Sequence, residues 1–95
     1  MAAYVIADVD VTDPAGYDEY RKGVPATIAA HGGRYLARGG AVQVLEGDWI
    51  PRRAVILEFP SLERARAWYD SPEYRPLREM RARASDSRLV IIDGV

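Results

Sequence analysis

Apolar residues, many of them β-branched, dominate three segments of the chain. They are residues 4–11 (YVIADVDV), 53–59 (RAVILEF) and 88–95 (RLVIIDGV). Segments of this length and composition are typical of β-strands. Residues 34–38 (RYLAR) and 41–47 (AVQVLEG) are shorter, and we predict that they form one long strand bent at Gly39 and Gly40.

A spacing of three or four residues separates the apolar positions between the first two strands. These positions are Tyr17, Tyr20, Val24 and Ile28, and they predict one amphipathic helix. Asp13 followed by Pro14 is a typical helix start, and Gly32 is well placed to end the helix in a left-handed conformation. Pro25 lies inside this pattern, and we expect it to kink the helix rather than end it.

A serine next to a proline occurs twice after residues 53–59, and each pair marks a helix start. Ser61 follows Pro60 and Ser71 precedes Pro72, which predicts two consecutive helical segments. The predicted order is β-α-β-β-α-β, with the second helix in two pieces. This is the α+β, ferredoxin-like arrangement, an antiparallel sheet with helices on one face. The length of 95 residues fits one such domain, residues 1–95.

The strands are more apolar than this arrangement requires. A strand covered by helices on one face alternates apolar and polar residues, but residues 54–57 and 89–92 are apolar at consecutive positions. The second face of the sheet must therefore be covered as well, and no predicted element is left to cover it. A second copy of the sheet, packed face to face in a two-fold homodimer, is the economical solution.

Composition removes several classes of function. The chain has no cysteine and one histidine, so thiolate zinc sites, iron–sulfur ligation and a metal site of several imidazoles are excluded within one chain. We expect no metal and no cofactor. The formal net charge of −1 disfavours a nucleic-acid partner. Residues 1–11 have neither a basic segment nor an unbroken apolar run, so we expect no signal peptide, no membrane span and a cytoplasmic location.

Several stretches of the sequence resemble the family called domain of unknown function thirteen-thirty. The most specific are HGGRYLARGG (residues 31–40), FPS (59–61) and SPEY (71–74), and the resemblance covers nearly the whole chain. That family is similar to the dimeric α+β barrel superfamily, in which two ferredoxin-like protomers close their sheets into a barrel. Related families include cofactor-free monooxygenases of polyketide pathways, muconolactone isomerases and chlorite dismutases. The resemblance implies a homodimer with a small-molecule pocket, but a fold does not determine chemistry.

The lone histidine and the glycine pairs of residues 31–40 have competing interpretations. His31 is either a general base at the edge of the sheet or a structural residue at the end of the preceding helix, and its position favours the structural role. Gly32 and Gly33 follow a helix and lack an accompanying lysine, so they do not match a phosphate-binding loop.

Strand alternation indicates where two carboxylates lie. Tyr4 and Asp8 belong to the face of the first strand that is expected to line the barrel, and Glu58 belongs to the same face of a neighbouring strand. Arg38 is then a candidate ion-pair partner for Asp8 or Glu58. Because a buried carboxylate needs a partner, these residues form either an acid–base or substrate-orienting group or a structural ion pair at the dimer interface.

The candidate site residues follow from these arguments. His31, Arg38 and Asp8 are the candidate catalytic residues, and the candidate ligand-binding residues are Tyr4, Glu58, Trp49 and Tyr69. Trp49 lies in a predicted connection, residues 47–52, and needs burial either over a pocket mouth or, as we favour, in the partner subunit.

The leading functional hypothesis is a homodimer that binds a small organic molecule, either between sheet and helices or inside the barrel. Two alternatives stay open at this point. One is a cofactor-independent oxygenase or isomerase-like enzyme, and the other is a non-catalytic structural or interaction module with a filled barrel. The sequence does not decide whether the protein is an enzyme.

Overall fold

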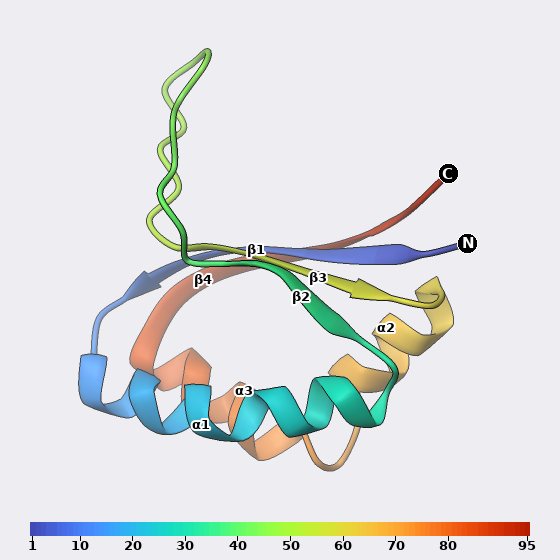
Figure 1. The fold of residues 1–95 in the computed structure, drawn as a ribbon. Helices are drawn as coiled ribbons and strands as arrows, with labels where there is room; N and C mark the ends of the chain where they lie inside the picture. The colour runs from blue at the N-terminus through green and yellow to red at the C-terminus, as the bar shows by residue number, and fades with distance from the viewer.

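The four strands form one antiparallel sheet in the order β2-β3-β1-β4 (Figure 1). The computed structural model describes residues 1–95. The strands are β1 (Ala3–Val11), β2 (Arg34–Arg38), β3 (Ala54–Phe59) and β4 (Ser85–Asp93), and the helices are α1 (Pro14–Ala30), α2 (Leu62–Tyr69) and α3 (Arg75–Ala84). The predicted ferredoxin-like α+β fold is confirmed, including the second helix in two pieces.

All three helices lie on one face of the sheet (Figure 1). The hydrophobic core lies between the sheet and these helices. The central strand β1 buries every second residue against the helices, as its alternation predicts: Ala3, Val5, Ala7 and Val9. The largest fully buried side chains in this layer include Trp68, Tyr74 and Phe59. The helix-facing side of the sheet is therefore a complete core within one chain.

The sheet face opposite to the helices, which we call the open face, is contacted by the rest of the chain only at Asp8, by Trp49 and Arg52. It carries Tyr4, Ile6 and Asp8 of β1, Ile56 and Glu58 of β3, and Val90 and Ile92 of β4. Val90 and Ile92 are 59% and 53% exposed. Strands with apolar residues on both faces were predicted to need a second cover, and the structure confirms that this cover is absent within the chain. Contiguous exposed apolar surface of this kind marks an interaction site.

Residues 39–53 differ most from the prediction. Residues 41–47 were predicted to continue the second strand beyond a bend, but this prediction is wrong for the single chain, because β2 ends at Arg38. Residues 40–52 take part in no backbone–backbone hydrogen bond. They form a long arm that projects from the sheet on the side away from the helices (Figure 1), with Leu45, Trp49 and Ile50 exposed. Alternation shows that a segment can pair as a strand, but it does not supply the partner.

The first helix begins and ends at the residues that the sequence indicates. The Asp13 side chain accepts a hydrogen bond from the backbone N–H of Gly16 (3.3 Å). Helix α1 then continues through Pro25 to Ala30, and Gly32 follows in the left-handed conformation with a φ of 74°. None of the helices combines the length and the apolar run that crossing a bilayer requires.

Candidate functional site

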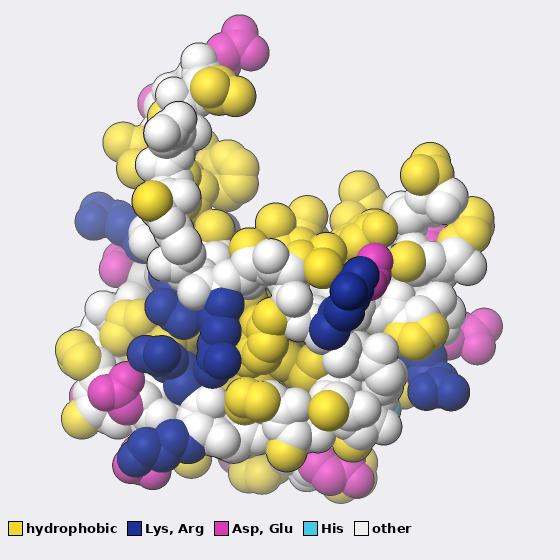
Figure 2. Space-filling view, in the orientation of Figure 1, with side chains coloured by type: hydrophobic (Ala, Val, Ile, Leu, Met, Phe, Trp, Pro, Cys, Tyr) yellow, Lys and Arg dark blue, Asp and Glu magenta, His cyan; other side chains and the backbone are white.

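A cavity lies between the helix-facing side of the sheet and α1, close to the edge strand β2. Seventeen residues line it, of which thirteen are hydrophobic and the other four are arginines. Its volume is about 40 Å³, whereas one water molecule needs roughly 10–15 Å³. Figure 2 shows a hollow with a hydrophobic floor on this side of the molecule, with Arg and Lys side chains gathered at one end. A mostly apolar lining with a few polar groups is typical of small-molecule sites, but this cavity is far smaller than the roughly 300–1,000 Å³ of pockets for drug-sized ligands.

A bulge in β2 directs Arg38 into this cavity. The register with β3 shifts between Tyr35 and Ala37, so Leu36 is an extra residue in the strand. The extra residue reverses the alternation that follows it. Arg38 therefore lies opposite Val55 on the helix-facing side, and its guanidinium carbon is 4.5 Å from the ring centre of Tyr35.

Arg53 enters the cavity from the root of the arm. Its carbonyl oxygen accepts a hydrogen bond from the backbone N–H of Val9 (2.9 Å), and its guanidinium carbon lies 5.6 Å from the ring centre of Tyr17. Gly39, at the other root of the arm, has a φ of 71°, and a Cβ atom there would overlap the Arg53 guanidinium. Glycine at position 39 thus allows the turn and also leaves the room that the Arg53 side chain occupies.

Arg81 is the one charged residue of the chain that is buried, with an exposed fraction of 7%. It reaches the cavity from α3 and donates a hydrogen bond to Ser87 Oγ in β4. Burial on its own lowers the pKa of Arg81, but the neighbouring phenol groups of Tyr74 and Tyr20 raise this pKa overall. The guanidinium therefore keeps its charge inside the cavity.

Two buried tyrosines form a hydrogen-bonded pair on the helix side of the cavity. The hydroxyl oxygens of Tyr20 and Tyr74 are 2.8 Å apart. Burial is the main reason why the pKa of Tyr20 is raised far above its usual value, and the nearby Tyr74 raises it further. Burial also raises the pKa of Tyr35. The phenols of Tyr20 and Tyr35 therefore stay protonated at neutral pH, and they can donate or accept hydrogen bonds but cannot act as phenolate bases.

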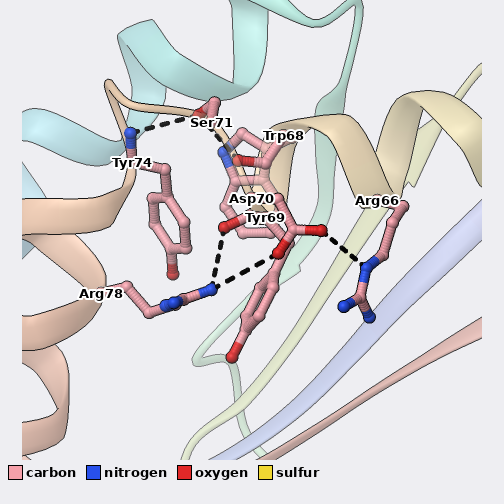
Figure 3. Close-up of polar contacts among 7 residues, drawn as sticks. All are labelled: Arg66, Trp68, Tyr69, Asp70, Ser71, Tyr74 and Arg78. Atoms are coloured by element: carbon pink, nitrogen blue, oxygen red, sulfur yellow. Dashed lines mark hydrogen bonds and ion pairs between the residues drawn. The ribbon is translucent and has the colours of Figure 1, made fainter.

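The turn between α2 and α3 holds the aromatic back wall of the cavity (Figure 3). Ser71 Oγ donates a hydrogen bond to the carbonyl oxygen of Trp68 (2.8 Å) and accepts one from the backbone N–H of Tyr74 (3.2 Å). The ring centres of Trp68 and Tyr74 are 4.1 Å apart. Trp68 Nε1 also donates to Thr27 Oγ1 in α1 (3.0 Å). The indole and phenol rings are thus fixed in orientation by the protein itself.

Three of the four arginines of the cavity have no negatively charged partner, and the fourth, Arg21, is paired with Asp18 at 3.4 Å. Neither an aspartate nor a glutamate lines the cavity. Arg38, Arg53 and Arg81 form no ion pair with any carboxylate of the chain. The Nε atoms of Arg53 and Arg81 are buried and have no hydrogen-bond partner. Because burying a charge without a partner is costly, this arrangement is one that an anion would complete.

The carboxylates predicted for the site lie on the open face instead, where both have partners. Asp8 accepts hydrogen bonds from Trp49 Nε1 and from the backbone N–H of Arg52, each at 3.0 Å. The Trp49 hydrogen bond is the main reason why the pKa of Asp8 is lowered. Glu58 accepts a hydrogen bond from Arg34 Nε at 2.6 Å. Their predicted placement opposite the helices is thus confirmed.

The predicted pairing of Arg38 with Asp8 or Glu58 is wrong. The bulge at Leu36 turns the Arg38 side chain to the other face of the sheet, and Arg34 takes its place beside Glu58.

His31, Tyr4 and Tyr69 also lie outside the cavity. His31 follows the end of α1, with its Nδ1 atom 3.0 Å from the carbonyl oxygen of Thr27, a geometry that fits the structural interpretation. Tyr4 lies on the open face, and the ring of Tyr69 packs against the Arg78 guanidinium, 4.5 Å from ring centre to guanidinium carbon. Of the seven predicted site residues, the structure brings Arg38 to the cavity and joins Asp8 with Trp49 elsewhere.

Arg53, Arg81, Tyr20 and Tyr74 are among the cavity residues that were not proposed from the sequence. One signal for Arg81 was available, because it follows Tyr74 and Leu77 at helical spacing and so continues the apolar stripe of α3. A charged residue at a core-facing position of a helix is a candidate for a functional group. For Arg53 the corresponding signal is its shared alternation with Val55 in β3.

Solved structures of several proteins resemble this one. A protein of unknown function from Rhodopseudomonas palustris has a TM-score of 0.75 at 21% sequence identity, covering 99% of this chain and 82% of that chain. A dimeric ferredoxin-like protein of unknown function from Thermobifida fusca has a TM-score of 0.69 at 21% identity, with coverages of 99% and 92%. SnoaB, a cofactor-independent oxygenase from Streptomyces nogalater, has a TM-score of 0.63 at 14% identity, also with coverages of 99% and 92%. At these identities the likeness establishes the fold alone.

The sequence itself gives a more specific result. No match to this chain was found among curated proteins. The sequence profile of the family described as domain of unknown function (DUF1330) matches residues 2–95. The profile therefore spans almost the whole sheet and its helices, and the chain belongs to the DUF1330 family.

Proposed function

We propose that the protein is a cytoplasmic homodimer, one domain per chain, that binds a small organic molecule in the cavity between sheet and helices. The observation that carries this proposal is the cavity itself. Its lining is mostly apolar, yet arginine side chains converge there and two of their Nε atoms have no partner within the chain. A site that serves packing alone is expected to avoid buried unsatisfied polar groups. For the same reason, a purely structural module is the less favoured interpretation.

The residues of the cavity support binding more than catalysis by the protein's own side chains. An oxygenase or isomerase that removes a proton from its substrate needs a general base within hydrogen-bond reach. The cavity lining contains no histidine, aspartate or glutamate, and burial raises the pKa of Tyr20. The likeness to SnoaB supports a common fold, and no residue of this cavity supplies the base.

A second copy of the chain is the partner that we propose for the open face. This face exposes Val90 and Ile92, and the arm that projects beyond it exposes Trp49 and Ile50. The unpaired backbone groups of residues 40–52 are available to pair with a strand of another chain. Two sheets packed face to face lie about 10 Å apart, so an arm of this length reaches the other protomer. The Thermobifida fusca protein with this fold is described as dimeric.

Native mass spectrometry of the protein purified gently from its own host tests both parts of the proposal. We expect the mass of a dimer plus the mass of a small molecule that is released when the protein is denatured. The variant Ala7→Leu places a larger side chain in the cavity wall, so it should remain dimeric and lose the additional mass. The control variant Ala82→Leu changes an exposed alanine of α3 and should retain it.

The outcomes separate the two parts. A dimer without any additional mass, in both the native protein and the control, would contradict ligand binding. A monomer at micromolar concentration would contradict the proposed partner of the open face.

A further inference from the structure

Resting on the second copy proposed above as the partner of the open face, we infer that one leg of the arm adds a strand to the free edge of β4 in that copy. The arm has a first leg, residues 41–45, and a second leg, residues 48–52. Glu46 and Gly47 separate the legs, and Gly47 has a φ of 83°. The first leg is the added strand. Three features of the molecule carry this inference: which edge of the sheet is unprotected, which leg is free to pair, and where the arm is directed.

The sheet has two edge strands, β2 and β4, and β2 is protected against pairing with another chain. It is five residues long, contains the bulge at Leu36 and carries Arg34 and Arg38. Short length, a bulge and charged side chains are the features by which natural proteins keep an edge strand from accepting a further strand. The edge at β2 is therefore a poor template.

The edge at β4 has none of these features along its second half. The strand pairs with β1 over nine residues in an unbroken register, and residues 89–92 (LVII) are apolar without a charge or a proline. No backbone hydrogen bond of the chain reaches the outer edge of this strand. Its outward N–H and C=O groups are therefore able to pair with a strand from another chain.

Both faces of the β4 edge offer apolar surface to an added strand. On the helix side, an open groove of about 580 Å³ lies between α2 and β4, and its lining includes Leu62, Ala67 and Ile91. On the open face, Val90 and Ile92 are exposed. Side chains that alternate along an added strand would thus find apolar neighbours on both faces.

The first leg has the composition that such a position requires. Val42 and Val44 belong to one face of an extended leg, and Ala41 and Leu45 belong to the other. Leu45 is 92% exposed within one chain. None of residues 41–45 forms a hydrogen bond within the chain through its backbone. This leg is therefore apolar on both faces and has its full set of backbone groups free.

The second leg is less able to pair. Pro51 has no N–H group, and proline is disfavoured inside a hydrogen-bonded strand. The leg is also attached to its own chain, because Trp49 Nε1 and the backbone N–H of Arg52 both donate hydrogen bonds to Asp8. These bonds hold the second leg beside β1 and leave the first leg to the other copy.

The root of the arm directs the first leg out of its own sheet. The bulge at Leu36 and the φ of 71° at Gly39 precede it, and the arm rises on the side away from the helices (Figure 1). Where two sheets pack nearly at right angles, strands that bend at bulges pass from one sheet to the other. Residues 40–45 span about 20 Å when extended, and packed sheets lie about 10 Å apart. The outer half of the leg therefore lies level with the second sheet.

Amide hydrogen exchange followed by NMR tests the pairing in the dimer. In one chain, residues 40–52 form no backbone hydrogen bond, so their amides would exchange as fast as those of an unfolded peptide. We expect alternate amides of residues 42–45 to exchange at least about a hundredfold more slowly, while the amides of Trp49 and Ile50 remain fast. Equal protection of both legs would show that the arm pairs with itself. Fast exchange of both legs in an intact dimer would show that neither is paired. Either result overturns the inference.

Mixed dimers identify the edge that receives the arm. The chain has no cysteine, so Glu46→Cys accepts a single nitroxide label next to the first leg. Labelled protein is mixed with ¹⁵N-labelled protein that carries no nitroxide, so that only contacts between copies broaden the observed signals. We expect the strongest broadening at the amides of residues 89–92, because β2 lies three strand spacings away, about 14 Å. Strongest broadening at residues 34–38 would assign the arm to the other edge and overturn the inference.

Proline substitutions measure what the pairing contributes to the dimer. Gln43→Pro and Val44→Pro each remove one N–H group, and neighbouring residues of a strand direct these groups to opposite sides. One of the two variants should therefore raise the Kd of the dimer at least about tenfold. The controls Gln43→Ala and Val44→Thr retain the N–H group and should change this Kd less than about threefold. Far-ultraviolet circular dichroism should show that all four variants fold, since the leg has no backbone hydrogen bond within its own chain.

The same experiments separate this inference from the proposed function. If both proline variants form dimers as tightly as their controls, the pairing of the arm is overturned, and a second copy still covers the open face. If the native protein is a monomer at micromolar concentration, the pairing and the proposed partner both fail.

Discussion

Replacing Arg81 by methionine should stabilise the ligand-free protein, and the contacts of Arg81 set the size of the effect. The side chain forms no ion pair, makes one side-chain hydrogen bond, to Ser87, and leaves Nε unsatisfied although only 7% of the residue is exposed. The lost hydrogen bond to a charged group is worth about 1.5–3 kcal/mol. Against it stands the desolvation of the guanidinium, several kcal/mol in real proteins.

Methionine retains an unbranched apolar side chain without the charge, and Ser87 is partly exposed, so its hydroxyl can bond to water. Substitutions of buried charged groups by apolar residues of similar size are often neutral or stabilising by about 1–4 kcal/mol. We therefore expect the free energy of unfolding of Arg81→Met to exceed that of the native protein by about 1 kcal/mol or more.

Urea denaturation followed by far-ultraviolet circular dichroism measures this difference, at one fixed protein concentration because the stability of a dimer depends on concentration. Arg83→Met is the matched control and should lie within about 0.5 kcal/mol of the native protein. If Arg81→Met is destabilised by more than about 1 kcal/mol without ligand, Arg81 is a structural residue and the reasoning fails.

Three further predictions concern the surroundings of the cavity and the arm. His31→Ala should lower the free energy of unfolding by about 1 kcal/mol or less, since it removes one favourable group at the end of α1; a loss of more than about 2 kcal/mol in urea denaturation would contradict this. Gly39→Ala should lower the free energy of unfolding by about 1 kcal/mol or more in urea denaturation, because a φ of 71° strains alanine and its Cβ displaces the Arg53 guanidinium; an unchanged free energy of unfolding would contradict this. The lowered pKa of Asp8 means that its charged form is favoured in the folded protein, so its contribution to stability is complete above its unfolded pKa near 3.9 and is lost as the pH falls through the folded value. Trp49 fluorescence should accordingly change below about pH 4 and should not titrate in Asp8→Asn, whereas a transition near neutral pH would assign the event to another group.

The regular parts of the fold follow from short-range signals in the sequence. Alternation in β1 predicts which residues face the helices, and the caps at Asp13 and Ser61 predict where α1 and α2 begin. These features depend only on residues a few positions away in the chain, so the local sequence is enough to predict them. The two-faced apolar pattern of the strands likewise predicts the open face without reference to another chain.

The candidate site was less predictable because it depends on one extra residue. The bulge at Leu36 has no signature in RYLAR, yet it decides whether Arg38 faces the carboxylates or the cavity. Arg53 and Arg81 are 28 positions apart in sequence, and they line the same cavity only because the sheet and α3 pack together. In the proposed dimer, the conformation of residues 41–47 depends on the second copy of the chain, whose position the alternation of one sequence does not give.

The arm has a consequence for the order in which the molecule folds. Strands β2 and β3 pair with each other although residues 39–53 separate them in the sequence. The arm is attached to the rest of its own chain only near its roots. There, Asp8 accepts hydrogen bonds from Trp49 and Arg52, and the backbone groups of Gly39 and Arg53 bond to Ala54 and Val9. In the proposed dimer, the remaining backbone groups of the arm gain partners only when two protomers meet. Refolding should therefore have a first-order phase that forms the sheet and helices and a second-order phase whose rate grows with protein concentration. Between the two phases, the unpaired backbone of the arm is the part of the chain most exposed to wrong pairing.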